Sequence, residues 1–118
     1  MYELKLNPRA FDSIISGLKT IEIRAGKCKD SCGQCVCRMQ KNQLINFTNT
    51  FDGKLLRCII KRVQHYDSVR KLLETEGTEY TLSSTNDLEK GIKSIHNISD
   101  YKERIIKYGV YAIELSPV

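Results

Sequence analysis

The sequence predicts a mixed α+β domain in which helices pack around a curled β-sheet. Strand-like runs lie near both ends of the chain, and stretches with helical periodicity lie between them. The length of 118 residues is close to the commonest size of one domain, and the composition is 41% hydrophobic and 28% charged. We therefore expect one domain over residues 1–118, without internal repeats.

The first helix should begin at Asn7 and Pro8, because Asn caps helices and Pro suits the first helical position. Gly17 is placed to end it. The hydrophobic residues of this stretch recur at helical spacing, which predicts one inward-facing stripe of Phe11, Ile14, Ile15 and Leu18.

A β-hairpin is predicted in the middle of the chain. Residues 44–48 and 55–63 are rich in β-branched and aromatic side chains, and residues 51–54 contain an Asp-Gly pair typical of turns. The small hydrophobic Cys58 on the longer strand should be buried.

Three further helices and a closing strand follow. One helix should begin at residues 66–68 and end near Gly77, and the next should begin at Asn86, reinforced by Glu89. A short helix is expected around residues 101–108. The run 109–115 alternates only weakly, which predicts a strand that is buried on both faces and lies inside the sheet.

Residues 17–24 form the most informative stretch, because hydrophobic and ionic side chains alternate directly after the first helix. In a strand, Ile21 and Ile23 would lie on one face, and Thr20, Glu22 and Arg24 would share the other. Such a face suits a polar ligand, although a solvated strand face has the same pattern.

Charge and cysteine usage indicate the compartment and the class of partner. Residues 19–62 hold ten Lys and Arg against three Asp and Glu, whereas the rest of the chain holds nine against eleven. A basic segment suits RNA or DNA, and a solvated lysine-rich surface is the alternative.

No hydrophobic run reaches the roughly 20 residues that cross a bilayer. We expect an intracellular protein, cytoplasmic or nuclear, with no membrane partner and with its five cysteines reduced or metal-bound.

Two sequence motifs carry a family resemblance. Residues 17–24 read Gly-x-Lys-Thr-Ile-Glu-x-Arg, and residues 108–114 read Tyr-Gly-Val-x-Ala-Ile-Glu. With the helix before and the β region between, the chain resembles the ASCH domain family of the PUA-like superfamily over nearly its whole length. The resemblance implies a PUA-like curled β-barrel with a cleft beside its second strand.

The preferred hypothesis is an RNA- or nucleotide-binding domain that performs no chemistry. The arginine fork suits phosphate or guanine, the carboxylate accepts from an exocyclic amine, and the lysine adds mobile positive charge. The candidate ligand-binding residues are Lys19, Thr20, Glu22 and Arg24, extended by Lys27, Lys29 and Arg38, with Tyr66 as a stacking ring.

The alternative is an enzyme. The resemblance extends to small amidohydrolases that deacetylate acetylated cytidine nucleosides with a lysine, a threonine and a glutamate. Lys19 matches their lysine, but Glu22 stands where they carry the nucleophilic threonine. Thr20 is two residues away, about 6.6 Å along a strand, which is too far for attack. Glu74 and Glu76 fall in the region of the glutamate. If the chain is an enzyme, Lys19 and Glu22 are its candidate catalytic residues.

A cysteine-rich loop adds a third hypothesis, a zinc-stabilised interaction module. Four thiolates within ten residues could complete a tetrahedral zinc site, but functionless or redox-active thiols fit the same spacing. These residues are Cys28, Cys32, Cys35 and Cys37. The loop also departs from the family, because residues 38–43 lack the Lys-x-Gly-Asp turn that commonly precedes the third strand. The cysteine loop is one candidate for fixing that turn.

Overall fold

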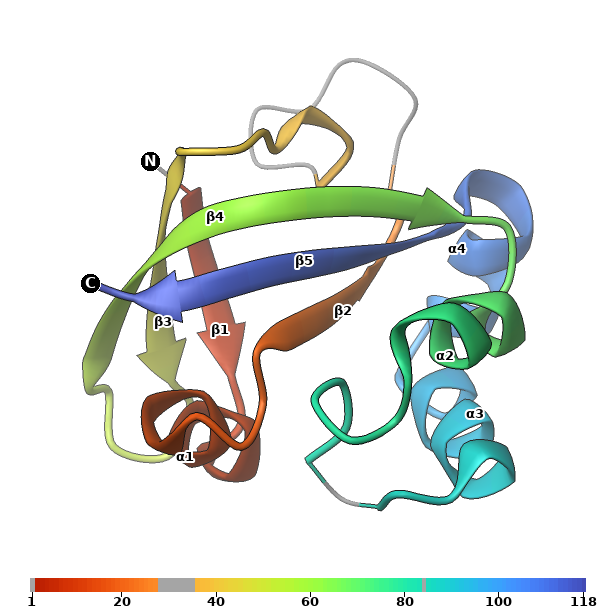
Figure 1. Ribbon diagram of the computed structural model, residues 1–118, viewed down its shortest axis with the longest axis horizontal. Helices are drawn as coiled ribbons and strands as arrows, with labels where there is room; N and C mark the ends of the chain where they lie inside the picture. The colour runs from red at the N-terminus through yellow and green to blue at the C-terminus, as the bar shows by residue number, and fades with distance from the viewer. Residues whose placement is uncertain (1, 28–35, 84) are drawn as a thin grey trace.

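The computed structural model describes residues 2–27, 36–83 and 85–118. These residues form a curled, mixed five-stranded sheet with four helices packed around it, which confirms the expected α+β class (Figure 1). The strands are β1 (Tyr2–Leu6), β2 (Ile21–Ala25), β3 (Leu44–Asn49), β4 (Leu55–Tyr66) and β5 (Val110–Pro117). The helices are α1 (Pro8–Ser16), α2 (Val69–Glu76), α3 (Leu88–His96) and α4 (Tyr101–Tyr108), with a 3-10 turn η1 (Val36–Arg38).

The sheet has the strand order β1-β3-β4-β5-β2, so β1 and β2 are its two edges. β1 pairs with β3 in parallel, and every other neighbouring pair is antiparallel. The curl brings the two edges together. The Arg24 guanidinium on β2 donates to the Lys5 carbonyl on β1 at 2.7 Å, which shows how close the edges are. The sheet is therefore a half-barrel whose opening lies between β1 and β2.

β5 carries hydrophobic residues into both of the buried clusters that stabilise the domain. Val110 and Ala112 belong to a cluster under α2, α3 and α4, whereas Ile113 and Leu115 belong to a cluster with α1, β1, β3 and β4. Alternate residues of a strand point to opposite faces. The prediction of an interior strand buried on both faces is thus confirmed, and Figure 1 shows α2, α3 and α4 gathered on one side.

The predicted ends of α1 are confirmed, but its stripe is narrower than expected. Asn7 caps the helix by accepting from the Ala10 N–H at 2.9 Å, and Gly17 ends it with φ of 82°. Ile15 is 54% exposed and Leu18 69% exposed, contrary to the prediction. The contact face of a nine-residue helix is already filled by Ala10, Phe11 and Ile14, and Leu18 follows the end of the helix.

The hairpin and the remaining helices lie close to where the sequence predicts them. Ser68 caps α2, and Cys58 on β4 is fully buried, which raises the pKa of its thiol to about 11. The cap of α3 is Asp87 rather than Asn86, since its carboxylate accepts from the Lys90 N–H at 2.8 Å.

The turn before β3 is fixed by its own backbone. Asn42 adopts φ of 75°, in the left-handed region that Asn tolerates better than most residues. Its N–H donates to the Ile60 carbonyl at 2.8 Å, and the Ile60 N–H donates to the Gln43 carbonyl at 2.9 Å. These two backbone hydrogen bonds join the turn to β4.

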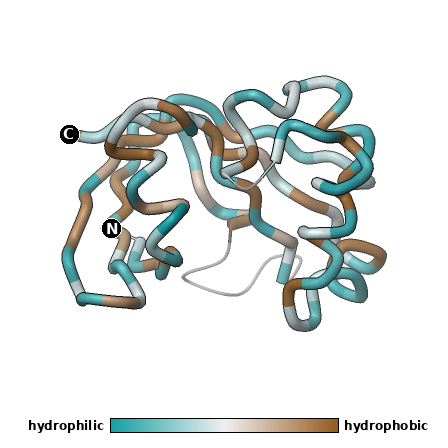
Figure 2. Tube along the Cα trace, turned by 90° about the horizontal axis from the view of Figure 1, so that it is seen from below, coloured by the Kyte–Doolittle hydropathy of each residue, from teal (hydrophilic) through white to brown (hydrophobic). Residues whose placement is uncertain are grey.

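Hydrophobic and hydrophilic residues alternate in short stretches along the chain, as Figure 2 shows. This alternation is what a two-sided sheet with amphipathic helices requires. Among the residues that the structure describes, no helix is long and hydrophobic enough to span a bilayer.

Candidate ligand-binding cleft

β2 has the two-faced character that its sequence predicts. Ile21 and Ile23 pack into the cluster under α2, α3 and α4, and Glu22 lies on the opposite face. The polar face is less open than a solvated strand face, because Glu22 is only 7% exposed. Burial of a carboxylate requires charged or hydrogen-bonding partners.

Glu22 is the centre of a buried ion cluster. Its Oε2 accepts from Arg24 Nε at 2.9 Å, and its Oε1 lies 3.5 Å from Lys19 Nζ. Two cations therefore share one carboxylate. Arg24 Nη2 also donates to the Lys5 carbonyl of the opposite sheet edge at 2.7 Å, which ties the guanidinium across the opening of the half-barrel.

Lys19, rather than Thr20, shares the site with Glu22. β2 begins only at Ile21, so the alternation of a strand does not apply to the two residues before it. Lys19 Nζ donates to the Thr81 carbonyl at 2.5 Å, and the Thr20 N–H donates to the Tyr80 carbonyl at 3.0 Å. Tyr80 and Thr81 thus form part of the wall beside β2.

The ion cluster lines a cleft of about 360 Å³ between β1, the start of α1, β2 and α3. We call it the basic cleft, since its charged lining residues are Lys5, Arg9, Lys19, Glu22 and Arg24. Lys5 and Arg9 are exposed at its rim, whereas Lys19 and Glu22 are buried. Among the residues that the structure describes, the lining holds four cations against one carboxylate, which is an excess of positive charge.

The rest of the lining is mixed. Ile95 and Ile98 provide hydrophobic surface, Tyr101 provides a ring, and Ser83 and Ser94 provide hydroxyls. None of these residues is among the predicted ligand-binding residues, although Tyr101 is one of the tyrosines that could stack on a base, and Lys5, Arg9 and Thr81 were not predicted either. Sequence periodicity cannot show that β1 and α3 close over β2, because that depends on the curl of the sheet.

Burial changes the acid–base behaviour of Lys19. Its pKa is lowered from the ordinary value, chiefly because burial disfavours the ammonium, while Glu22 opposes the shift. The charged form of Lys19 is therefore less favoured than that of an exposed lysine. Perturbed ionisable groups in a cleft are typical of functional sites.

The other candidate residues lie elsewhere. Lys27 is exposed and lines a neighbouring hollow that shares Arg24 and Tyr101 with the basic cleft. Arg38 is exposed on η1, outside the lining of either hollow. Tyr66 lies at the end of β4, where its hydroxyl donates to Glu76. Lys29 lies outside the described residues.

The proposed zinc site also falls largely outside the described residues. Cys28, Cys32 and Cys35 belong to the segment that the structure leaves undescribed, and Cys37 is half-buried on η1. Within the described ranges, no group of three or more His, Cys, Asp or Glu is placed to hold a metal ion. The four-cysteine site stays a prediction.

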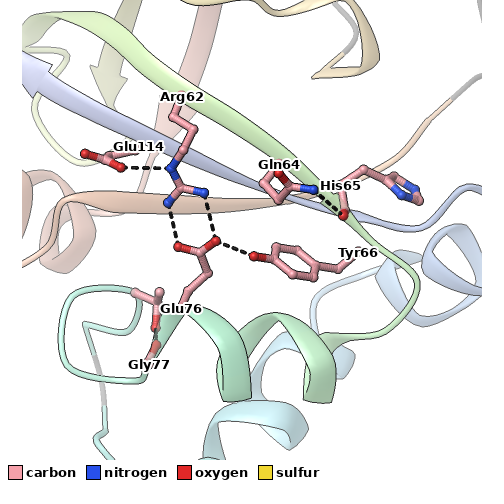
Figure 3. A network of polar contacts seen from close by, with 8 residues as sticks. Arg62, Gln64, His65, Tyr66, Glu76, Gly77 and Glu114 are labelled. Atoms are coloured by element: carbon pink, nitrogen blue, oxygen red, sulfur yellow. Dashed lines mark hydrogen bonds and ion pairs between the residues drawn. The ribbon is translucent and has the colours of Figure 1, made fainter.

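Neither candidate for a catalytic glutamate lines the basic cleft. Glu74 is exposed on α2. Glu76 accepts two hydrogen bonds from Arg62, at 2.6 and 2.9 Å, and one from Tyr66 (Figure 3). The cleft therefore combines a lysine with Glu22 but with neither of these glutamates.

Comparisons with known proteins agree with the motifs at residues 17–24 and 108–114. The family model of the ASCH domain matches residues 4–118. The crystal structure of the hypothetical protein PH0355 is 32% identical, with a TM-score of 0.80, and the match covers 99% of this chain and 98% of that one. The solution structure of PF0455 from Pyrococcus furiosus is 31% identical, with a TM-score of 0.74 and coverage of 99% and 96%.

A more distant match shows the same fold. A mutant of ZmASCH from Zymomonas mobilis is 16% identical, with a TM-score of 0.62, over 98% of this chain and 73% of that one. The comparison with curated proteins found no match.

Proposed function

Because the chain belongs to the ASCH domain family, whose fold is related to PUA domains, we propose that its basic cleft binds RNA or a nucleotide. The observation that carries this proposal is the charge of the cleft, where, within residues 2–27, 36–83 and 85–118, four cations and the carboxylate of Glu22 form the charged lining. Nucleic acids are polyanions, and a concentrated positive charge in a hollow attracts them.

The division of charge between floor and rim supports an orientation for the ligand. Lys19 and Arg24 already share Glu22 in the interior, whereas Lys5 and Arg9 have no carboxylate partner among the described residues. Phosphate contacts come mainly from such exposed, unpaired cations. We therefore place a phosphate at the rim, beside β1 and the start of α1.

The interior suits the base rather than the phosphate. Glu22 accepts hydrogen bonds and Lys19 donates them, which is the mixture that a nucleobase edge requires. Tyr101 and Ile98 supply flat or hydrophobic surface against which a ring packs. Bases offer both properties, whereas a bare inorganic anion would gain nothing from the hydrophobic wall.

The test is RNA binding by single variants, measured as fluorescence anisotropy with a labelled single-stranded RNA of about ten nucleotides. Arg24→Ala should weaken binding by about tenfold or more, because it removes a charged fork from the interior. Arg9→Ala should reduce affinity. It should also lower the slope of log affinity against log salt concentration by about one. Lys54→Ala is the matched control, since Lys54 is 76% exposed on the β3–β4 turn, outside the cleft lining.

Equal losses in Arg9→Ala, Arg24→Ala and Lys54→Ala would contradict a defined cleft and indicate diffuse charge attraction. An absence of RNA binding by the wild-type protein would reject the proposal for RNA. Titration with single nucleoside monophosphates under the same conditions would then test the nucleotide alternative.

One observation favours the enzyme hypothesis as a second candidate. Lys19 is a buried lysine with a lowered pKa beside a carboxylate, an arrangement used for proton transfer. Against it, Glu22 replaces the expected threonine, and Glu76 is engaged by Arg62. Release of acetate from acetylated cytidine, lost in Lys19→Ala, would support an amidohydrolase. An inactive wild-type protein would exclude it.

A further inference from the structure

A second charged cluster lies outside the basic cleft, where the end of α2 meets β4 and β5. It consists of Arg62, Tyr66, Glu76 and Glu114, and we call it the Arg62 cluster (Figure 3). The Arg62 guanidinium holds Glu76 through two parallel hydrogen bonds and Glu114 through Nε at 3.0 Å. Bidentate pairs of this kind are stronger and more directional than single hydrogen bonds between neutral groups.

A β-bulge places Arg62 in this position. The register of β4 against β5 shifts between Ile60 and Arg62, so that Arg62 stands opposite Glu114. The hydrogen bond from Arg62 lowers the pKa of the Glu76 carboxyl, which remains ionised. The side chain of Glu76 is only 8% exposed, and Glu76 is the last residue of α2.

Two hydrogen bonds, joined by the chain itself, connect the residue after Glu76 to the floor of the basic cleft. Gly77 ends α2, and its carbonyl accepts from the Thr81 hydroxyl at 2.7 Å. The Thr81 carbonyl in turn accepts from Lys19 Nζ at 2.5 Å. Thr81 is fully buried, so its position depends on these bonds and not on solvent.

The same segment is tied to β2 through its backbone. The N–H groups of Thr20 and Ile21 both donate to the Tyr80 carbonyl, at 3.0 and 3.1 Å. Residues 77–81 therefore bridge two supports, the Arg62 cluster at one end and the start of β2 at the other. A change at Glu76 would remove the side-chain part of the first support, while the hydrogen bond from the Gly77 N–H to the Leu73 carbonyl at 2.8 Å and the second support remain.

We propose that Glu76, clamped by Arg62 and Tyr66, is a positioning residue for the basic cleft. By anchoring the start of residues 77–81 it fixes the Thr81 carbonyl, which holds the Lys19 ammonium beside Glu22. This inference rests on the proposed function only in assigning ligand binding to the cleft. The role differs from that of the glutamate in the amidohydrolases, because Glu76 acts through Thr81 and need not touch a ligand.

A matched pair in the same region separates positioning from general stabilisation. Arg70 and Glu89 form a second two-pronged ion pair, at 2.8 and 3.1 Å, which joins α2 to α3. Neither residue is hydrogen-bonded to residues 77–81 in the described structure. Glu89→Ala removes an ion pair of the same chemistry without releasing the Thr81 carbonyl.

The experiment compares Glu76→Ala with Glu89→Ala by two readouts. The first is the pH titration of Lys19, followed by NMR of its ε-carbon. The second is anisotropy with the single-stranded RNA. In Glu76→Ala we expect the Lys19 midpoint to rise towards the ordinary lysine value, because a loosened wall admits water. RNA affinity should fall about fivefold to tenfold. Glu89→Ala should leave both unchanged.

An unchanged Lys19 midpoint in a folded Glu76→Ala protein would overturn the inference, whatever happens to RNA binding. Equal shifts in the two variants would also overturn it, since they would indicate general loosening. If Glu76→Ala fails to fold, Tyr66→Phe removes one bond to Glu76 and should shift the midpoint in the same direction by less. If the wild-type protein binds no RNA, the proposed function fails while the Lys19 titration still decides the positioning role.

Discussion

The basic cleft and the Arg62 cluster are built from the same residue types in opposite proportions. In the cleft, Lys19 and Arg24 share the one carboxylate of Glu22, and all three side chains are at most 22% exposed. In the Arg62 cluster, Arg62 lies between the carboxylates of Glu76 and Glu114 and is 40% exposed.

This difference in charge distinguishes a candidate ligand-binding site, the basic cleft, from a structural ion cluster, the Arg62 cluster. Buried charges are costly when they are incompletely paired, so an excess of buried cations is retained at a cost to stability. A ligand with negative charge would relieve that cost. The Arg62 cluster has no excess of positive charge to offer a polyanion, and its hydrogen bonds instead join secondary-structure elements.

The largest expected effect is on the free energy of unfolding of Glu22→Ala. Removing the shared carboxylate leaves Lys19 and Arg24 buried without a counter-charge, which should cost about 3–5 kcal/mol. Glu114→Ala is the matched change in the Arg62 cluster and should cost about 1 kcal/mol or less, because Glu114 is 38% exposed. Urea unfolding measures both, and similar losses would remove the distinction between the two clusters.

The two clusters should also respond to opposite ends of the pH scale. The pKa of Glu76 is lowered on folding by its hydrogen bond from Arg62, so its stabilisation is present above the unfolded carboxyl pKa of about 4.3. That stabilisation is lost as pH falls through the folded value. The wild-type protein should therefore lose stability in acid more steeply than Glu76→Gln, and parallel urea-unfolding curves would contradict this.

In the cleft the dependence on pH has the same sign but a different cause, since the pKa of Lys19 is lowered by burial of its ammonium. Burial lowers the pKa of Lys19, so between the folded value and the unfolded value of about 10.4 the unfolded chain binds more protons. The stability of the wild-type protein should rise with pH across that window relative to Lys19→Met. A constant difference between the two proteins would show that Lys19 titrates as an ordinary lysine.

The smallest expected effect concerns Thr81, which connects the two clusters. Thr81→Val keeps the shape of the side chain but removes its hydrogen bond to the Gly77 carbonyl, for a loss of about 1 kcal/mol. Because this bond is the link between Gly77 and Thr81, RNA affinity should fall about as much as in Glu76→Ala. A larger loss of affinity in Thr81→Val would place the anchor of the segment at Thr81 instead.

Local signals in the sequence predicted most of the elements. Asn7, Gly17 and Ser68 mark helix ends through hydrogen bonds made within a few residues, and such bonds depend little on the rest of the fold. The alternation in β2 likewise placed Glu22 opposite Ile21 and Ile23. These features hold because neighbouring residues in the chain determine them.

The rest of the site depends on contacts between distant residues. Nothing in the sequence pairs Arg24 with the carbonyl of Lys5, or Lys19 with that of Thr81, since both acceptors are backbone atoms that every residue has. Ile15 and Leu18 were misassigned for a related reason, because the width of the stripe depends on the sheet that it meets. The closure of the cleft is thus a property of the curled sheet.

That closure also affects how the two sheet edges meet other molecules. An exposed edge strand presents free backbone groups that can pair with a strand of another chain and start aggregation. Here two backbone groups of β2 are already hydrogen-bonded, the Ile21 N–H to the Tyr80 carbonyl and the Ala25 carbonyl to the Arg104 guanidinium. On β1, the Lys5 carbonyl accepts from Arg24. The contacts that shape the cleft therefore also protect the half-barrel against the growth of its sheet from one molecule into the next.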